Sequence, residues 1–221
     1  MELSEAMKNR HSVRQYTSKA IDTDLLANLQ KEIDACNAEG GLHIQLVTDE
    51  PKAFDSLMAH YGKFSGVTNY IALVGKKQKG LDEACGYYGE RLVLKAQQMG
   101  LNTCWVAMSY KKVPDAFKVD KGEKLTVVIA LGYGKTQGVA HKSKPIEQIS
   151  DIRGNTPAWF QAGVAAALLA PTAMNQQKFR LTYADGTVIA LAGKGFYTKL
   201  DLGIVKYHFE IGAGKENVIW G

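Results

Sequence analysis

The feature that most constrains the fold of this chain is a corner in its last third, where a very apolar helix must give way to a strand. Residues 160–169 predict the helix and residues 178–183 predict the strand. Pro171 ends the helix, because proline cannot continue it. The loop between the two carries hydroxyl and amide groups at Thr172, Asn175 and Gln177. Such groups can bind a planar ligand with polar edges, although an ordinary polar loop has the same composition.

The size and composition indicate a globular protein of one large domain, or of two small halves that share a core. The chain has 221 residues, of which 46% are hydrophobic and 22% are charged. These values are typical of a soluble protein. No apolar run approaches the ~20 residues that cross a bilayer, and the first residues lack the basic and apolar parts of a secretory signal. We therefore expect no membrane partner.

The cysteines favour a reducing compartment. Cys36, Cys85 and Cys104 form no closely spaced pair, so the sequence indicates neither a zinc site nor a disulfide framework. The cytoplasm is the simplest setting for such a chain.

The net charge of +5 raises the question of a nucleic-acid partner. The basic residues are scattered and do not follow one helix, as they would on a surface built for nucleic acid. A solvated surface with one or two small anion sites explains the charge better. We therefore expect no nucleic acid among the partners.

Two short basic clusters are candidates for those anion sites. In an extended segment Arg10, Ser12 and Arg14 would share one face, because side chains alternate with a period of two. Two guanidinium groups and a hydroxyl grip phosphate or carboxylate well, whereas His11 could simply bond a backbone group. The second cluster is residues 141–145. A solvated turn remains the alternative for the first cluster, and a surface loop for the second.

Hydrophobic periodicity and turn residues predict the order of helices and strands. Helices are expected at residues 2–8, 22–38, 51–61, 81–99, 110–117, 157–169 and 200–209. Strands are expected at residues 42–47, 70–75, 101–108, 125–131, 178–183 and 188–192. The last two strands are separated by a short turn at residues 184–186, which predicts a hairpin.

The two ends of the chain show a faint internal repeat. Arg10 precedes a helix, a loop and the strand at 42–47, and Arg153 precedes a helix, a loop and the strand at 178–183. The loop is polar only in the second copy, and the basic cluster is rich only in the first. These observations lead to the hypothesis that each copy kept half of one site.

Three segments together carry a resemblance to a known family: RHSVRQY early, GLNTCWVAMSY in the middle and APTAMNQQKFRL late. This set resembles the nitroreductase family of flavin enzymes, and the resemblance covers nearly the whole chain. It implies an α+β fold with a mixed sheet flanked by helices. It also implies FMN as the bound cofactor and, as is usual in the family, an intertwined homodimer.

The order of the segments departs from the common family pattern. A segment of the type Pro-Ser-Ser-x-Asn-x-Gln-Pro-Trp usually follows the first helix closely, whereas its counterpart here, residues 171–179, lies near the C-terminus. Lys178 stands where the family usually has proline. The chain thus resembles a divergent branch in which residues 1–221 form one domain, with two halves, 1–148 and 149–221, sharing one core. A monomer that mimics the family's dimer and a homodimer both stay open.

The resemblance implies a cofactor contact for each residue that matches a family motif. The phosphate, ribityl chain and pyrimidine edge of FMN would be contacted by Arg10, His11, Ser12 and Arg14. The phosphate grip would be completed by Lys142 and Lys144. The ring and the ribityl chain would lie along Pro171, Thr172, Ala173, Asn175 and Gln177. Backbone amides near the reactive ring nitrogen would come from Trp105, Val106, Ala107 and Met108. Cys104 is better explained as core packing than as a redox thiol.

The function that this resemblance implies is an FMN-dependent oxidoreductase. NADH or NADPH would bind transiently and deliver a hydride, and a nitro or quinone compound would accept the electrons. The cofactor performs the chemistry, so we expect neither a catalytic acid–base pair nor a metal. A non-catalytic flavin or nucleotide binder is the main alternative, because the late motif is degenerate at Lys178 and Phe179. A basic interaction module is a third interpretation and predicts salt-sensitive binding to nucleic acid.

Overall fold

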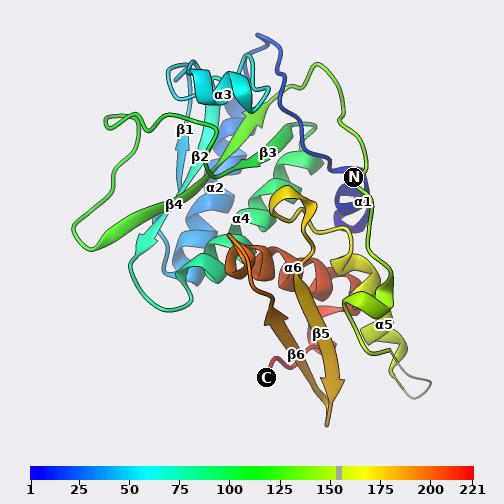
Figure 1. Ribbon diagram of the computed structural model, residues 1–221. Coiled ribbons are helices and arrows are strands. Elements are labelled where there is room, and N and C mark those ends of the chain that lie inside the picture. The colour runs from blue at the N-terminus through cyan, green and yellow to red at the C-terminus, as the bar shows by residue number, and fades with distance from the viewer. Residues whose placement is uncertain (153–155) are drawn as a thin grey trace. The chain divides into compact units, whose positions relative to one another are not determined.

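The computed structural model in Figure 1 describes residues 1–152 and 156–221 and combines helices with β-strands, which confirms the α+β class. The chain divides into two units. The first, which we call the sheet unit, consists of residues 9–81 and 92–139. The second, which we call the hairpin unit, consists of residues 1–8, 82–91 and 140–221.

The sheet unit is built on strands β1 (Gln45–Val47), β2 (Asn69–Lys76), β3 (Asn102–Val106) and β4 (Glu123–Gly132). They pair antiparallel in the order β1-β2-β4-β3, and parallel bridges join the segment around Ser12 to β3 and Gln15 to Ser65. β2 is buried along all but its last residue. This burial explains its continuous apolar run, since a strand covered on both faces needs no alternation.

Two helices of the sheet unit each bury side chains. Helix α2 (Thr23–Gly40) buries Leu29, Ile33 and Cys36, and Figure 1 shows it along one face of the strands. Gly41 ends α2 in the left-handed conformation with φ of 59°, which glycine adopts without steric cost. The short helix α3 (Leu57–Tyr61) begins at Ser56, whose side chain accepts a hydrogen bond from the amide of Ala59.

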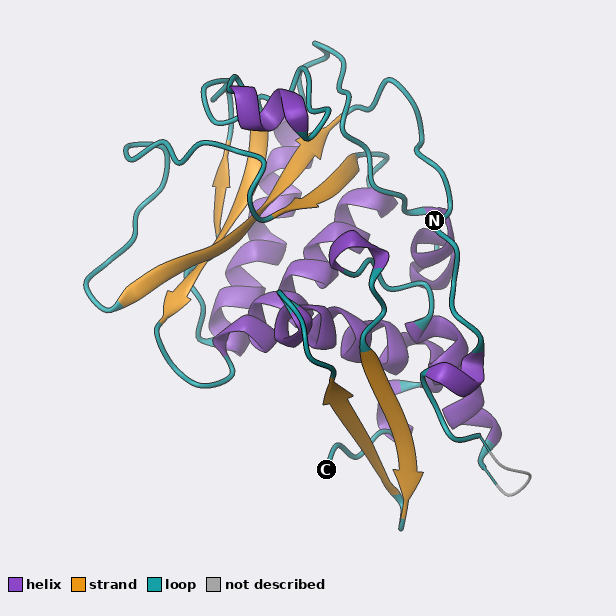
Figure 2. Cartoon of the chain, in the orientation of Figure 1, coloured by secondary structure: helices purple, strands orange, loops and turns teal. Residues whose placement is uncertain are grey.

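The hairpin unit contains helix α1 (Leu3–Asn9) as far as Lys8 and residues 82–91 of α4 (Leu81–Gln98). It also contains α5 (Ala158–Ala167) and α6 (Thr198–Ala213). Strands β5 (Phe179–Ala184) and β6 (Thr187–Ala192) form the hairpin that Figure 2 shows beside α6. Asp185 and Gly186 form its turn with φ of 49° and 79°. Two positive φ values match the right-handed twist of the strands, and this confirms the predicted hairpin.

Buried polar contacts join α6 to the part of α4 that belongs to the hairpin unit. His208 and Glu90 lie 2.8 Å apart with fully buried side chains, and the hydroxyl of Tyr87 donates a hydrogen bond of 2.5 Å to Glu210. The C-terminal tail docks on the same helix, because the indole nitrogen of Trp220 also donates to Glu210 at 2.8 Å. Short 3₁₀ helices η1 (Ile146–Gln148), η2 (Ala173–Asn175) and η3 (Lys215–Asn217) complete the described elements of this unit.

Two predicted helices were wrong in whole or in part. The helix expected at 51–61 begins only at Leu57, because the Glu50 carboxylate accepts the amides of Lys52 and Ala53 and holds a turn there. The segment 110–117 forms turns and extended backbone. Its apolar side chains pack separately against the aromatic core around Phe54 and Tyr70, and this packing outweighs local helix propensity.

Arg153, on which the predicted repeat depends, lies outside the described residues. The repeat and the halves 1–148 and 149–221 therefore stay predictions. None of the described helices is both long enough and apolar enough to cross a membrane.

Candidate functional site

The early basic cluster lies along the edge of the sheet in the sheet unit. Ser12 forms a parallel bridge with Thr103 of β3, and the amide of Val13 donates to the Thr103 carbonyl at 3.0 Å. Val13 points into the core with 2% of its surface exposed. The alternate side chains Arg10, Ser12 and Arg14 all act on the thiol of Cys104. Burial raises the pKa of Cys104, while the charge of Arg14, a hydrogen bond with Ser12 and the charge of Arg10 oppose that rise. The shared face of Arg10, Ser12 and Arg14 stays a prediction.

A third segment, residues 61–65, is attached to the early cluster by main-chain hydrogen bonds. The amide of Ser65 donates to the Arg14 carbonyl at 3.0 Å, and the amide of Tyr16 donates to the Ser65 carbonyl at 2.9 Å. Segments far apart in the sequence are thus held side by side by backbone, without reliance on flexible side chains. A binding surface built on them is preorganised.

The three segments line an open concavity of about 410 Å³. Its lining residues are Arg14, Tyr61, Gly62, Lys63, Phe64, Trp105, Val106, Ala107 and Ser109. The motifs in the sequence predicted four of these, namely Arg14 and residues 105–107. The predicted Met108 does not line the concavity and is 68% exposed. Residues 61–64 and Ser109 were missed.

Two backbone features explain how the missed residues shape the concavity. A Cβ atom at Gly62 would lie 2.6 Å from the Cβ of Ser109, so only glycine allows the two walls to approach this closely. Lys63 has φ of 62° and donates its amide to the His60 carbonyl at 2.8 Å. A left-handed lysine is strained, and such strain often accompanies a functional site. A Gly-Lys pair directly after a helix was the available sequence signal.

The lining chemistry suits a flat, electron-poor or anionic ring. Arg14 and Lys63 supply two cations, and Tyr61 and Trp105 supply aromatic surface. The chain from Trp105 to Ala107 adds main-chain groups. Arg14, Tyr61 and Lys63 are exposed, so a ligand could reach them without a rearrangement of the core.

The loop at residues 171–177 forms a compact hydrogen-bond network in the hairpin unit. Gln177 is 3% exposed and lies at its centre. Its side-chain amide donates to the Lys142 carbonyl and to Asn175 Oδ1, both at 2.8 Å, and its Oε1 accepts the Lys144 amide at 2.8 Å. The Gln177 amide donates to Thr172 Oγ1 at 3.0 Å. The second basic cluster and the late motif, distant in sequence, are therefore neighbours, as a shared role requires.

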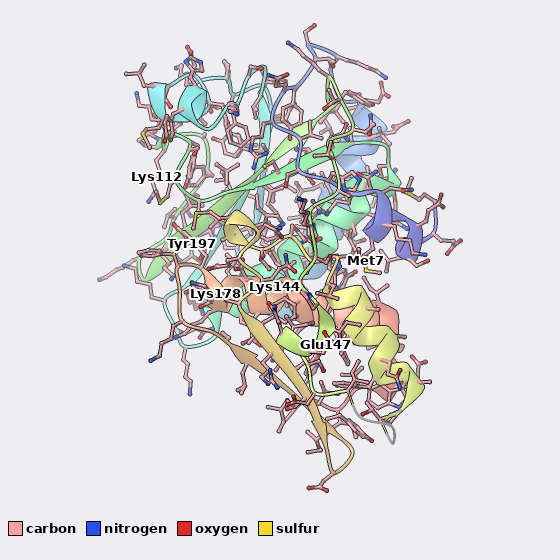
Figure 3. All side chains as sticks on the ribbon, turned by 45° about the vertical axis from the view of Figure 1, so that its right-hand side comes forward. Met7, Lys112, Lys144, Glu147, Lys178 and Tyr197 are labelled. Atoms are coloured by element: carbon pink, nitrogen blue, oxygen red, sulfur yellow. The ribbon has the colours of Figure 1, made fainter. Side chains whose placement is uncertain are left out.

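The side chain of Lys144, from the second basic cluster, takes part in this hydrogen-bond network. Lys144 Nζ donates to the carbonyls of Gln176 and Gln177 at 2.8 and 3.1 Å. Figure 3 shows Lys144 next to the start of β5, where Lys178 is labelled. The Asn175 side chain donates to the Lys142 carbonyl at 2.9 Å. These contacts hold the loop together, and the predicted contact of Lys144 with a phosphate stays a prediction.

Asp201, near the start of α6, binds the late loop and was not predicted from the sequence. Its carboxylate accepts the Ala173 amide at 2.9 Å and the Gln176 side-chain amide at 2.7 Å. Burial raises the pKa of Asp201 to about 6, although both hydrogen bonds oppose this rise. The only local signal was an acidic residue among apolar neighbours in the first turn of a helix.

One group in the described part of the chain has the residue types of a metal site. His43, Asp120 and Glu123 place their ligand atoms within 4.8 Å of one another in the sheet unit. Glu123 already accepts a hydrogen bond from the Asp120 amide and lies 2.8 Å from His43 Nδ1, and Lys118 pairs with Asp120 at 3.0 Å. The group is therefore satisfied as an ordinary surface network.

The model of the family described as "Putative TM nitroreductase" matches residues 2–213, and the chain belongs to this family. A "putative nitroreductase" from Thermotoga maritima has a similar structure, with a TM-score of 0.68, 23% identity and coverage of 98% of this chain and 85% of that one. A "putative nitroreductase in complex with FMN" from Desulfovibrio desulfuricans has a TM-score of 0.55 and 16% identity, covering 71% and 99%. The NfrA1 nitroreductase from B. subtilis has a TM-score of 0.56 and 13% identity, covering 70% and 74%.

These solved structures share the fold of this chain, which confirms the nitroreductase-like architecture expected from the motifs. No curated protein matches the sequence. The predicted site residues fall into two sets. Arg10, His11, Ser12, Arg14 and residues 105–108 lie in the sheet unit, and Lys142, Lys144 and residues 171–177 lie in the hairpin unit.

Proposed function

We propose that this protein is an FMN-dependent oxidoreductase that receives a hydride from NADH or NADPH and reduces nitro, quinone or similar acceptors. The observation that carries the proposal is the concavity of the sheet unit, where Arg14, Lys63 and the Trp105–Ala107 backbone line one space. Membership of the nitroreductase family supports it. A fold neighbour described as a "putative nitroreductase in complex with FMN" adds support, as does one described as a "Putative NADH dehydrogenase/NAD(P)H nitroreductase".

The residues present fit the cofactor. A flat ring with polar edges needs cations or amides at its rim and apolar surface on its faces. The lining of the concavity includes two cations, Arg14 and Lys63, and two aromatic side chains, Tyr61 and Trp105. When bound, FMN supplies the ring that accepts and donates the hydride. Arg14 and Lys63 would bind negative charge, and the Gly62–Ser109 approach would hold the width of the concavity. Trp105 would cover one side, and the amides of residues 105–107 would hydrogen-bond the ring edge.

The late loop carries the other residues that the family motif implies for flavin. Thr172 and Gln177 hold this loop from within. Asn175 is exposed, and its side chain donates to the Lys142 carbonyl and accepts from Gln177. Its second N–H and second lone pair would face the ring and ribityl chain, as the family motif implies. Lys142 would complete the phosphate grip, because the phosphate carries nearly two negative charges and the Lys142 side chain is exposed.

The absorbance spectrum of the purified protein tests the proposal. We expect a yellow protein after incubation with FMN, whose visible absorbance bleaches when NADH or NADPH is added without oxygen and returns when a quinone or nitro compound is added. A protein that stays colourless after FMN and gel filtration would refute it. A protein that holds FMN but shows no bleaching with either donor would favour the non-catalytic flavin binder, which the replacement of Pro-Trp by Lys178 and Phe179 motivates.

The remaining expectations are part of the same proposal. A reducing cytoplasmic setting is supported by three cysteines that are all buried thiols. Sedimentation equilibrium would decide between a monomer that mimics the family's dimer and a homodimer. Salt-dependent retention on nucleic acid without flavin would favour the basic interaction module instead.

A further inference from the structure

A buried carboxylate in the hairpin unit holds the part of the late loop that is exposed. Asp201 is 2% exposed, and its two oxygens accept hydrogen bonds from the two ends of a short turn. Oδ1 accepts the Ala173 amide at 2.9 Å, and Oδ2 accepts the Gln176 side chain at 2.7 Å. The residues between these anchors, Met174 and Asn175, are exposed.

The turn between the anchors adopts a conformation that it would not keep alone. Met174 and Asn175 have φ of 51° and 53°. Two successive non-glycine residues in the left-handed region are unfavourable and persist only where the surroundings determine them. The Asn175 amide donates to the Thr172 carbonyl at 2.9 Å, but this bond lies within the turn. Outside the turn, the Lys142 carbonyl accepts the Asn175 side chain and Lys144 Nζ donates to the Gln176 carbonyl, and Asp201 binds both ends of the turn.

A carboxylate suits this position better than its amide isostere. Gln176 Nε2 donates both to Asp201 and to the Phe196 carbonyl, at 2.7 and 2.9 Å. Asp201 must therefore present acceptors to two donors, and an ionised carboxylate is an acceptor only. Asparagine would turn a donor toward one of them. A flip of Gln176 that relieved this conflict would break its bond to Phe196.

The position of Asp201 is itself rigid. It lies in the first turn of α6, and its amide donates to the Tyr197 carbonyl at 2.8 Å. Leu200 and Leu202 on either side of it are each 5% exposed. The carboxylate is thus supported by a packed helix, whereas the loop that it holds is exposed at its tip.

We propose that Asp201 is a positioning residue for flavin, which fixes the Ala173–Gln176 turn in the shape that presents Met174 and Asn175 to the cofactor. The inference rests on the proposed function, and it names a residue outside the three family motifs. Asp201 does not touch the cofactor in this scheme. Its effect is on the affinity for flavin, through the loop.

The protonation of Asp201 provides a readout that general destabilisation would not mimic. Its pKa lies near 6 because of burial, and the opposing influences are the two hydrogen bonds described above. No charged side chain of the described residues is among these influences; Lys144 faces the same turn from the 141–145 cluster but binds the Gln176 carbonyl. The ionised form holds the turn, so the anchor is present at pH 7.5 and is lost as the pH falls through about 6.

The test compares the dissociation constant of FMN for the wild type and for Asp201→Asn between pH 5 and pH 8, by quenching of flavin fluorescence. The FMN phosphate also titrates near pH 6, but its effect cancels in the ratio of the two constants. We expect the dissociation constant of Asp201→Asn, divided by that of the wild type, to be about 10 at pH 7.5 and to approach 1 at pH 5. Asp185→Asn, an exposed site in the hairpin turn, is the matched control and should keep a ratio of 1 throughout.

The outcomes separate the inference from the function on which it rests. Wild-type protein that does not bind FMN at any pH overturns both. Wild-type protein that binds FMN, with a ratio near 1 at every pH, overturns only the role of Asp201, even if the variant melts at a lower temperature. If Asp201→Asn does not fold, Gln176→Met removes one of the two bonds from the loop side. This variant should weaken the binding of FMN severalfold at pH 7.5, and an unchanged affinity for FMN would overturn the inference.

Discussion

Alanine at Gly203 should destabilise the protein, because two helices of the hairpin unit approach each other closely at glycine. A Cβ atom at Gly203 of α6 would lie 1.9 Å from the Glu83 carbonyl oxygen and 2.6 Å from the Tyr87 amide nitrogen of α4. The approach is reciprocal, since a Cβ atom at Gly86 of α4 would lie 2.0 Å from the Leu200 carbonyl oxygen. The obstacles are backbone atoms, so the helices must separate.

The expected magnitude is the difference between two opposing effects. Alanine favours a helix interior over glycine by roughly 1 kcal/mol. Overpacking costs about 1–3 kcal/mol and occasionally more, and a backbone obstacle at 1.9 Å places Gly203→Ala at or above the upper end. We therefore expect a net loss of about 2 kcal/mol. For a chain of this length it should lower the melting temperature by about 4–8 °C.

Differential scanning calorimetry of Gly203→Ala and Gly86→Ala measures this effect. Lys199→Ala, at an exposed position of the same helix, is the control and should change stability by less than ~0.5 kcal/mol. Gly203 is two residues from Asp201, so the loop that Asp201 holds should also loosen and FMN affinity should fall. A Gly203→Ala protein that melts at or above the wild-type temperature would refute the close approach of the helices.

Two further predictions concern the sheet unit. Lys63→Met should weaken FMN binding about three- to tenfold, since an exposed cation near an anionic ligand contributes about 1 kcal/mol. The control Lys31→Met makes the same charge change on the exposed side of α2 and should leave the dissociation constant unchanged. Equal dissociation constants for both variants would contradict the role of Lys63. The pKa of Glu123 is held below its usual value, first by the hydrogen bond with His43. The hydrogen bond therefore stabilises the folded protein above the ordinary carboxyl pKa, and this contribution is lost as the pH falls through the lowered pKa. His43→Leu should flatten the acid side of a plot of unfolding free energy, measured with urea, against pH. A plot parallel to that of the wild type would contradict this pairing.

Many elements of the fold could be predicted because their signals are local. Gly41 ends α2 and the Asp185–Gly186 turn closes the hairpin through positive φ values that glycine and aspartate tolerate well. β2 was recognised from its apolar run. The helix predicted at residues 110–117 was wrong. Its apolar residues match a helical pattern by composition, but they pack against aromatic rings from distant parts of the chain.

The candidate site divides in the same way. Arg14 and residues 105–107 were predicted from motifs and do line one concavity. The basic cluster 141–145 was predicted as an anion site, and the structure shows that Lys144 Nζ binds two loop carbonyls. A motif specifies which residue types are present, but the groups that surround a side chain decide how it is used.

The amino-acid sequence by itself determined the family, the α+β class and the polar segments that a flavin would need, because each depends on residue types at short spacing. Only the tertiary structure decided that Gly62 and Lys63 form a wall of the concavity and that Asp201 anchors the late loop. The reason is physical. The wall depends on a close approach of Gly62 to Ser109, and the anchor depends on a buried carboxylate reaching the amide of Ala173, 28 residues away in the chain. Neither distance follows from local periodicity.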